Sequence, residues 1–355
     1  MNKLVIIGNG FDLAHGLKTS YKDFILWHIN KVYQQNYIGK TESKLIVIET
    51  NFDKTYVPNI SKYDDYISLK KSIEKDGRFR LEIKGKYDFI NRILNDIELY
   101  NWVDIEKLYY DSLVKIFTDY EPGFHDRAEL NNLNKALDLI RVELEEYLST
   151  ISTQQMDIDL PPEIVDIFRS NMISDMPIAN NENLYFLNFN YTNTIINYRN
   201  KFGINLTVNY IHGKLNEKNN PIIFGYGDET DKNYETIENL NENEFTRHFK
   251  SFSYLTTSNY QDLFKFLDSD EFDVHVMGHS LGLSDRLLFN HIFEHPHFRK
   301  VQLYYYEYEK DGVVVNDFFQ KTQELSRHFK LDSKHKMRTK VVPFSESKPL
   351  NTYKP

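Results

Sequence analysis

The residues of this sequence that could do chemistry gather in four short polar segments, each placed directly after an apolar run. The first segment follows the run at positions 4–7 and comprises Gly8, Asn9, Gly10, Phe11 and Asp12. Glycines in such a turn let the backbone bend sharply and approach a phosphate without a Cβ in the way. Backbone N–H groups would then face the phosphate oxygens, so this turn is a candidate for the phosphate side of a nucleotide pocket.

The two glycines of this turn also have a purely structural explanation. A tight connection between a strand and a helix needs glycine even without a ligand, so Gly8 and Gly10 alone do not decide between packing and phosphate binding. Position 13 is Leu, so the G-x-G-x-x-G spacing of hydride-transfer enzymes is absent, which argues against a conventional dehydrogenase. If the turn binds phosphate, a branched side chain at Gly10 is expected to weaken nucleotide binding while the protein stays folded.

The second and third segments supply candidate catalytic side chains. Asn190 lies in the segment 188–192, and His212 is followed by Gly213 at the end of the run 206–211. An asparagine can exchange hydrogen bonds with a ribose or a carboxamide, although asparagine also favours turns for its own backbone bonding. A histidine at the end of a strand can act as a base near neutral pH, although a lone histidine is more often structural. We take Asn190 and His212 as the catalytic candidates.

The fourth segment follows the run 272–277 and begins with small residues. Its candidate nucleotide-binding residues are Gly278, His279, Ser280 and Asp285. Small side chains there would allow a ribose or a phosphate to lie against the backbone. The twelve histidines show no spacing that completes a metal site with a nearby carboxylate, and the chain has no cysteine to bind zinc. We therefore expect no metal cofactor.

The elements that must position these segments follow from the apolar runs. The run 4–7 shows no alternation, which is typical of a strand buried on both faces of a parallel sheet. Comparable strand signals occur at positions 184–187, 206–211, 221–224, 272–277 and 301–306. Because the carboxyl ends of parallel strands lie at one edge of a sheet, the four polar segments are expected to meet there.

A long stretch between the first strand and the later ones has a different pattern. Residues from about 20 to 178 show mostly helical periodicity, and Ser20 with Asp23 fits a capping box at the start of a helix. Asp104 and Glu106 fall in the first turn of another expected helix. Pairing with the helix dipole is a sufficient explanation for acidic residues at that position.

The sequence thus predicts an α/β fold with a Rossmann-like parallel sheet and a large helical insertion. The nucleotide-site core comprises residues 1–19 and 184–330, the mostly helical insertion lobe comprises residues 20–178, and a loosely ordered tail covers residues 333–355. Positions 41–86, inside the insertion, are polar and mixed, and we assign them no element and no role.

Composition narrows the functional classes. The formal net charge is −9, so nothing indicates the basic surface of a free nucleic-acid binder, and no nucleic-acid partner is expected. No apolar run approaches the ~18 residues of a membrane span, and the N-terminal run is too short for a signal peptide. We expect a cytoplasmic protein without membrane contact, and the sequence leaves open whether it forms a homo-oligomer.

The order of the polar segments is more specific than any one of them, and it resembles the signature of the AbiH family of bacteriophage-resistance proteins. The resemblance spans about residues 3 to 310 and is most specific in Leu4 to Leu17 with Thr19 to Phe24. It continues in Trp102, Asp104 and Glu106 and in the blocks 188–192, 211–213, 224–228 and 278–285. It implies a protein of phage defence, for which a phage or host protein is a candidate trigger.

AbiH proteins in turn resemble sirtuins distantly. The residues that match sirtuin motifs are Gly8, Gly10, Asn190, His212, Gly278 and Ser280. This resemblance implies NAD as substrate or ligand, with His212 as the base and Asn190 positioning water or ribose hydroxyls. Thr192 stands where sirtuins have an aspartate, which leaves the nicotinamide contacts undecided. The lack of cysteine argues against the zinc-containing sirtuin deacylases and fits the zinc-free sirtuin-like domains that hydrolyse NAD.

Three functional hypotheses follow. The leading one is an NAD hydrolase that releases nicotinamide once infection switches it on. The second is a nucleotide-binding sensor without catalysis, whose helical insertion contacts a phage or host partner; it predicts NAD or ADP-ribose binding without turnover. The third is a metal-dependent phosphoesterase or nuclease, which requires a bound metal and an activity abolished by chelation.

Overall fold

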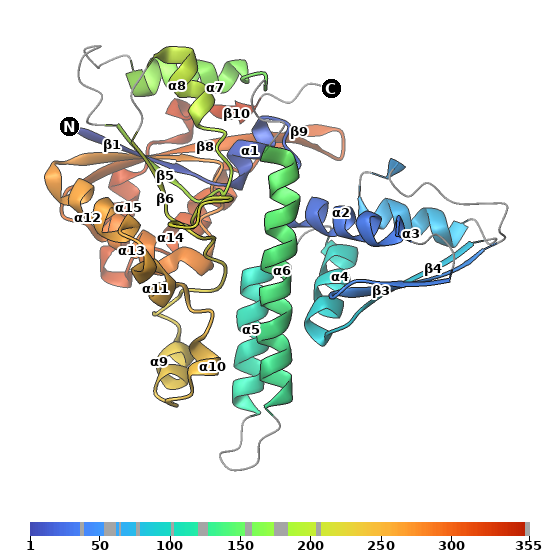
Figure 1. Ribbon diagram of the computed structural model, residues 1–355. Helices are drawn as coiled ribbons and strands as arrows, with labels where there is room; N and C mark the ends of the chain where they lie inside the picture. The colour runs from blue at the N-terminus through green and yellow to red at the C-terminus, as the bar shows by residue number, and fades with distance from the viewer. Residues whose placement is uncertain are drawn as a thin grey trace.

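The computed structural model describes residues 1–35, 39–52, 62–63, 65–75, 79–100, 103–119, 127–152, 158–173, 184–203 and 207–351. These residues form a mixed α/β protein in which a mostly parallel central sheet carries helices on both faces (Figure 1). A second group of helices with a small antiparallel sheet lies to one side of this core (Figure 1). None of the described helices is long and apolar enough to cross a membrane.

The first strand occupies the middle of the central sheet, as its unalternating apolar run predicts. Strand β1 (Asn2–Ile7) pairs in parallel with β5 (Leu184–Asn188) on one side and with β7 (Phe272–Met277) on the other. Leu4 and Ile6 belong to the hydrophobic core on one face, and Val5 and Ile7 belong to the core on the opposite face. Both faces are covered, which explains the unbroken apolar run from Leu4 to Ile7.

The strand order places a change of direction beside β1. The order is β10-β8-β7-β1-β5-β6, with β6 (Thr207–Tyr210), β8 (Phe298–Lys310) and β10 (Pro349–Asn351) also parallel to their neighbours. Among the described strands of this sheet, β9 (Val313–Asn316) alone is antiparallel to its neighbour, β8. The chain runs outward from β1 through β5 to β6 and then returns to the other side of β1 to form β7 and β8. Connections that diverge in this way leave a crevice at the carboxyl ends of the two strands.

Helices cover the two faces of the sheet through separate hydrophobic cores. The core that contains Leu4 is covered by α12 (Asn259–Ser269), α13 (Arg286–Glu294), α14 (Phe318–Ser326) and α15 (Lys334–Lys340). The core that contains Val5 is covered by α1 (Asn9–Ala14), α7 (Pro162–Ile167), the π-helix Phe168–Ile173 and α8 (Ile196–Phe202).

The insertion has a hydrophobic core of its own. Its helices are α2 (Tyr21–Tyr33), α3 (Tyr66–Lys75), α4 (Asp88–Tyr100), α5 (Ile105–Thr118) and the long α6 (Ala128–Ser152). The predicted capping box of α2 is confirmed, because the Ser20 hydroxyl accepts from the Asp23 N–H while the Asp23 carboxylate accepts from the Ser20 N–H. Two short helices from the core's side also pack on this lobe, α9 (Lys232–Glu238) and α10 (Asn243–Thr246). Phe249, directly before α11 (Lys250–Ser253), is buried in the same hydrophobic core.

The unassigned positions 41–86 contribute much of a small antiparallel sheet. This sheet has the order β2-β3-β4, formed by β2 (Gly39–Glu42), β3 (Ile46–Phe52) and β4 (Phe79–Gly85). Ile46 and Ile48 of β3 are buried and Glu49 is exposed. A sheet with one solvated face needs few apolar residues, which explains why the sequence here looked mixed.

Two predictions, one for the segment 221–224 and one for the segment 333–355, differ from the structure. The prediction of a strand at 221–224 is wrong, because the segment does not pair in the sheet. Its three apolar residues after the exposed Pro221 are buried, with Ile222 and Phe224 in the insertion's core and Ile223 in a core of the sheet. An apolar run therefore arose from burial between two cores. The segment 333–355, expected to be loosely ordered, contains α15 and the edge strand β10 within its described part. Leu350 anchors β10 because its side chain is fully buried beneath the sheet.

Candidate functional site

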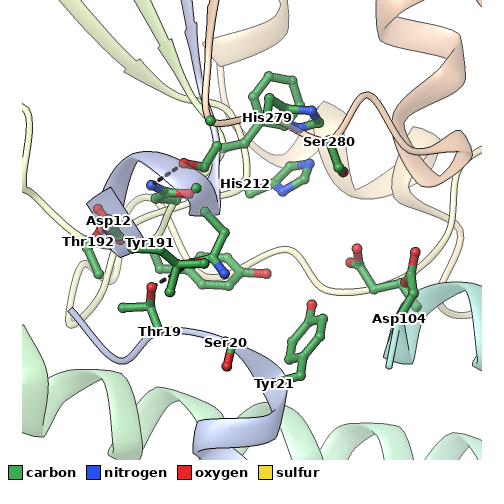
Figure 2. A pocket seen from close by; sticks show the side chains of 18 of the residues that line it. Asp12, Thr19, Ser20, Tyr21, Asp104, Tyr191, Thr192, His212, His279 and Ser280 are labelled. Carbon is green, nitrogen blue, oxygen red and sulfur yellow. Dashed lines mark hydrogen bonds between the residues drawn. The ribbon is translucent and has the colours of Figure 1, made fainter. Parts of the chain in front are cut away.

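A cavity of about 440 Å³ opens at the carboxyl ends of β1, β5 and β7. The core lines it with residues of the loops that follow these strands and with Thr19 and His212. The insertion lines it with Ser20 to Lys22, Asp104 and Glu106. Figure 2 shows these side chains converging from the two lobes, with His212 and His279 on one side and Thr19, Ser20 and Tyr21 on the other. The cavity is thus a crevice between the sheet edge and the insertion.

All the site residues predicted from the sequence line this cavity except Phe11. The Phe11 side chain is fully buried in the core on one face of the sheet, with its ring centroid 4.6 Å from that of His15 and 5.7 Å from that of Tyr198. A helix turns each successive side chain by about 100°, so Asp12 faces the crevice while Phe11 faces the sheet. The assignment of Phe11 as a binding residue is therefore replaced by a packing role.

The glycines of the site bring two loops into direct backbone contact. The Gly10 N–H donates to the Gly278 carbonyl at 2.8 Å, and a Cβ at Gly10 would lie 2.7 Å from that same oxygen. A Cβ at Gly8 would lie 2.5 Å from the Cα of His279. Gly278 itself has a φ of +76°, which an L-residue rarely adopts. A folded Gly10→Val variant is therefore no longer expected, because the branched side chain would meet backbone before it met any ligand.

His212 is held by a buried carboxylate. Its Nε2 lies 2.9 Å from Oδ1 of Asp285 and 3.2 Å from the Tyr254 hydroxyl. Although burial acts to raise the pKa of Asp285, Lys250 and His212 hold it well below its usual range, so Asp285 is ionised. A ring nitrogen facing a carboxylate must carry the proton, and within the described part of the chain Nδ1 makes no hydrogen bond. Burial and Lys250 also lower the pKa of His212, which leaves Nδ1 free to accept a proton at neutral pH.

A fully buried lysine completes this group. Nζ of Lys250, with a side chain 0% exposed, lies 2.9 Å from Oδ1 of Asp285 and 3.0 Å from Oε2 of Glu106. Nothing in the sequence around Lys250 marked it as a site residue, because neither of its partners is near it in the chain. Glu106 lies in the first turn of α5, as the sequence predicts. The helix dipole is not a sufficient explanation for this residue, because its carboxylate also accepts from Lys250 and from the Gly225 N–H, each at 3.0 Å.

The neighbouring acid Asp104 lies directly before the first turn of α5, as its N-cap. Its carboxylate accepts from the Lys107 N–H at 3.0 Å and caps α5. Trp102, the first residue of the same family element, lies outside the described residues.

The loop after β5 is fixed by asparagine side chains. The Asn190 amide donates to the Gly8 carbonyl at 3.0 Å, which ties the end of β5 to the end of β1. The Asn188 side chain accepts from the Asn190 N–H at 3.0 Å and donates to the Thr192 carbonyl at 3.1 Å. Asn190 therefore shapes the loop and also lines the crevice, so the structural and functional interpretations are both compatible with its position.

Asp12 is a buried carboxylate in the wall of the crevice. Its Oδ2 accepts a hydrogen bond from the Thr192 hydroxyl at 2.5 Å. Burial raises the pKa of Asp12 to about 6, while hydrogen bonds from Thr192, Thr194 and Asn190 act in the opposite direction. The crevice therefore holds an acid that changes its charge close to neutral pH.

The remaining polar groups of the wall are uncharged or belong to the insertion. His279 accepts at Nδ1 from the Leu281 N–H, and burial lowers its pKa to about 3. The Thr19 hydroxyl donates to the Asn9 side chain at 2.6 Å, so the segment before α2 is bonded to the turn that follows β1.

Across the described ranges, no three His, Asp or Glu side chains are arranged to hold a metal ion.

These features define an α/β protein with a polar crevice at the carboxyl edge of a mostly parallel sheet, closed on one side by an inserted lobe. The model of the bacteriophage abortive infection AbiH family matches residues 4–307, and the chain belongs to this family. No curated protein matches the chain. Family membership implies a role in phage abortive infection, as the order of the sequence motifs predicts.

Proposed function

We propose that this protein acts in abortive infection by hydrolysing the bond between nicotinamide and ribose in NAD. The observation that carries the proposal is the pairing of His212 with Asp285, in a crevice that Asn190 also lines. A neutral histidine oriented by a carboxylate is an arrangement suited to general-base chemistry. Cytoplasmic location, with NAD or a related nucleotide as the ligand, belongs to the same proposal.

The strand order supports a Rossmann-like, sirtuin-like core. Five neighbouring strands of the sheet lie in the order β6-β5-β1-β7-β8. Numbered by their order along the chain, these five strands read 3-2-1-4-5, which is the order in which dinucleotide-binding sheets are built. In such sheets the ligand lies outside the carboxyl ends of the strands, where the order reverses. The crevice lies at this point, between the ends of β1 and β7.

The reaction needs little acid help, because the nicotinamide of NAD leaves as a neutral molecule from a cationic ring. The bond between C1′ of the ribose and the ring nitrogen breaks, its electron pair passes to that nitrogen, and positive charge develops on the ribose. A water oxygen then bonds to C1′, and Nδ1 of His212 accepts the proton that the water loses. General-base help of this kind is typically worth ~10²–10⁴-fold in rate.

The carboxylates of the wall suit such a transition state. Asp12 and Asp104 line the crevice outside the ion-paired group of Lys250, Glu106 and Asp285, and Lys22 is the sole lysine or arginine among its described lining residues. Negative charge near the ribose stabilises the positive charge that develops when nicotinamide leaves. The Asn190 amide, fixed by Gly8, would orient a ribose hydroxyl or the attacking water.

The test is incubation of the purified protein with NAD, followed by detection of nicotinamide. His212→Ala should reduce nicotinamide release by at least about 100-fold. Lys201→Ala, an exposed position on α8, is the matched control and should keep the full rate. In infected cells, the native protein should deplete NAD and the His212→Ala protein should not. Phage protection with constant NAD would refute the proposal, and NAD or ADP-ribose binding without nicotinamide release would favour the sensor.

A further inference from the structure

One carboxylate oxygen in the crevice serves three donors from separate parts of the chain. Oδ1 of Asp285 lies 2.9 Å from Nζ of Lys250, 2.9 Å from Nε2 of His212 and 3.4 Å from the Tyr254 hydroxyl. Asp285 follows β7, His212 follows β6, and Lys250 begins α11. The Lys250 ammonium is also bound by Glu106 of α5, which belongs to the insertion.

The balance of charge around His212 depends on Lys250. A histidine paired with an isolated buried carboxylate tends to take a second proton, because the carboxylate stabilises the imidazolium. Here the Lys250 ammonium offsets the charge of Asp285 on the same oxygen, and although Glu106 also binds this ammonium, burial raises the pKa of Glu106 to about 7, so Glu106 carries only part of a negative charge at neutral pH. A second cation on that oxygen would repel the first, so the ring of His212 is favoured in its neutral form.

The other groups around His212 do not replace Lys250 in this role. Tyr254 is a neutral hydroxyl, because burial and the charge of Asp285 raise its pKa well above the usual value. His279 lies on the other oxygen of Asp285, at 3.9 Å, and is neutral because burial lowers its pKa to about 3. Phe189 packs edge-on against the imidazole ring and carries no charge. In the described part of the chain, the one permanent cation bonded to the partner of His212 is Lys250.

We propose that Lys250 is a positioning residue that, anchored by Glu106, holds Asp285 against Nε2 of His212 and keeps His212 in the neutral, proton-accepting form. The inference rests on the proposed function of His212 as the base, but it concerns the state of the histidine before any substrate binds. It also gives the insertion a part in the chemistry, because Glu106 fixes the ammonium from the lobe opposite the sheet.

The test compares three variants by the titration of His212 and by the pH profile of nicotinamide release. Lys250→Met removes the charge, Lys250→Gln removes it but retains a hydrogen-bond donor, and Lys250→Arg retains both. The control is Lys321→Met, which removes another buried lysine that does not line the cavity; its ammonium contacts the His279 carbonyl and Asp317 but not Asp285. The titration is followed by NMR of labelled histidine, with the resonance assigned through His212→Gln.

The two neutral variants should raise the pKa of His212 by at least about one pH unit, the effect of removing a like charge at this range. The acid limb of nicotinamide release should move upward by the same amount, while Lys250→Arg and Lys321→Met should leave the titration of His212 in place. An unchanged titration in whichever of the two neutral variants folds would overturn the inference. So would a native His212 that is charged at neutral pH. The NMR titration needs no substrate, so a shifted titration without NAD hydrolysis would support the role of Lys250 and refute the proposed reaction.

Discussion

Asp12 offers a direct test of how the buried site is charged. The residue is 1% exposed, and burial raises the pKa of its carboxyl from 3.8 to about 6. Between these two values the unfolded chain has released the proton and the folded chain still holds it. The raised pKa therefore lowers the free energy of unfolding as the pH rises through this window. Asp12→Asn removes the titration while keeping an oxygen that can accept from the Thr192 hydroxyl.

The expected size of the effect follows from the shift. A difference of about two pH units, at about 1.4 kcal/mol per unit, corresponds to about 3 kcal/mol. The stability of Asp12→Asn relative to the native protein should therefore increase by about this amount between pH ~3.5 and ~7. Urea unfolding followed by circular dichroism at a series of pH values measures the difference. Comparing the two proteins at each pH cancels the titration of the buried His279, which acts in the opposite direction.

The control for this experiment is Asp166→Asn. Asp166 is an exposed residue whose pKa is lowered by hydrogen bonding and ion pairing with Lys348, so the relative stability of this variant should stay level or fall as the pH rises. If the relative stability of Asp12→Asn stays constant from acid to neutral pH, the burial argument for Asp12 fails. A decrease with rising pH would show that the ionised form is the one the fold favours.

Three further outcomes follow from packing and burial. Gly10→Val should lower the free energy of unfolding by more than about 3 kcal/mol or prevent folding, because its Cβ would meet the Gly278 carbonyl. A folded variant with a native Tm would contradict this. Deleting residues 349–355 should lower the free energy of unfolding by about 2–4 kcal/mol, because the buried Leu350 side chain is lost. An unchanged Tm would show that β10 does not stabilise the sheet. His279→Gln should make the protein less sensitive to acid. Burial lowers the pKa of His279 from 6.5 to about 3, so the native protein loses stability as the pH falls through this range. Equal urea midpoints for His279→Gln and the native protein at each pH would contradict that assignment.

The sequence alone determined the features that depend on local pattern. The unalternating run at Leu4 to Ile7 predicted a strand covered on both faces, and Ser20 with Asp23 predicted a helix start, because both patterns depend on neighbours in the chain. The polar segments after each run could be placed at one edge because parallel strands share their direction. The order of these segments also identified the family.

The tertiary structure decided which residues share charge and space. Glu106, Lys250 and Asp285 lie on separate elements, and only folding brings them within hydrogen-bond distance of one another. The apolar segment 221–224 could not be distinguished from a strand by its residues, because burial between two cores selects the same side chains as burial in a sheet. Local patterns record what each segment needs to fold, whereas the partner of a buried charge is set by the long-range packing that removes water from both groups.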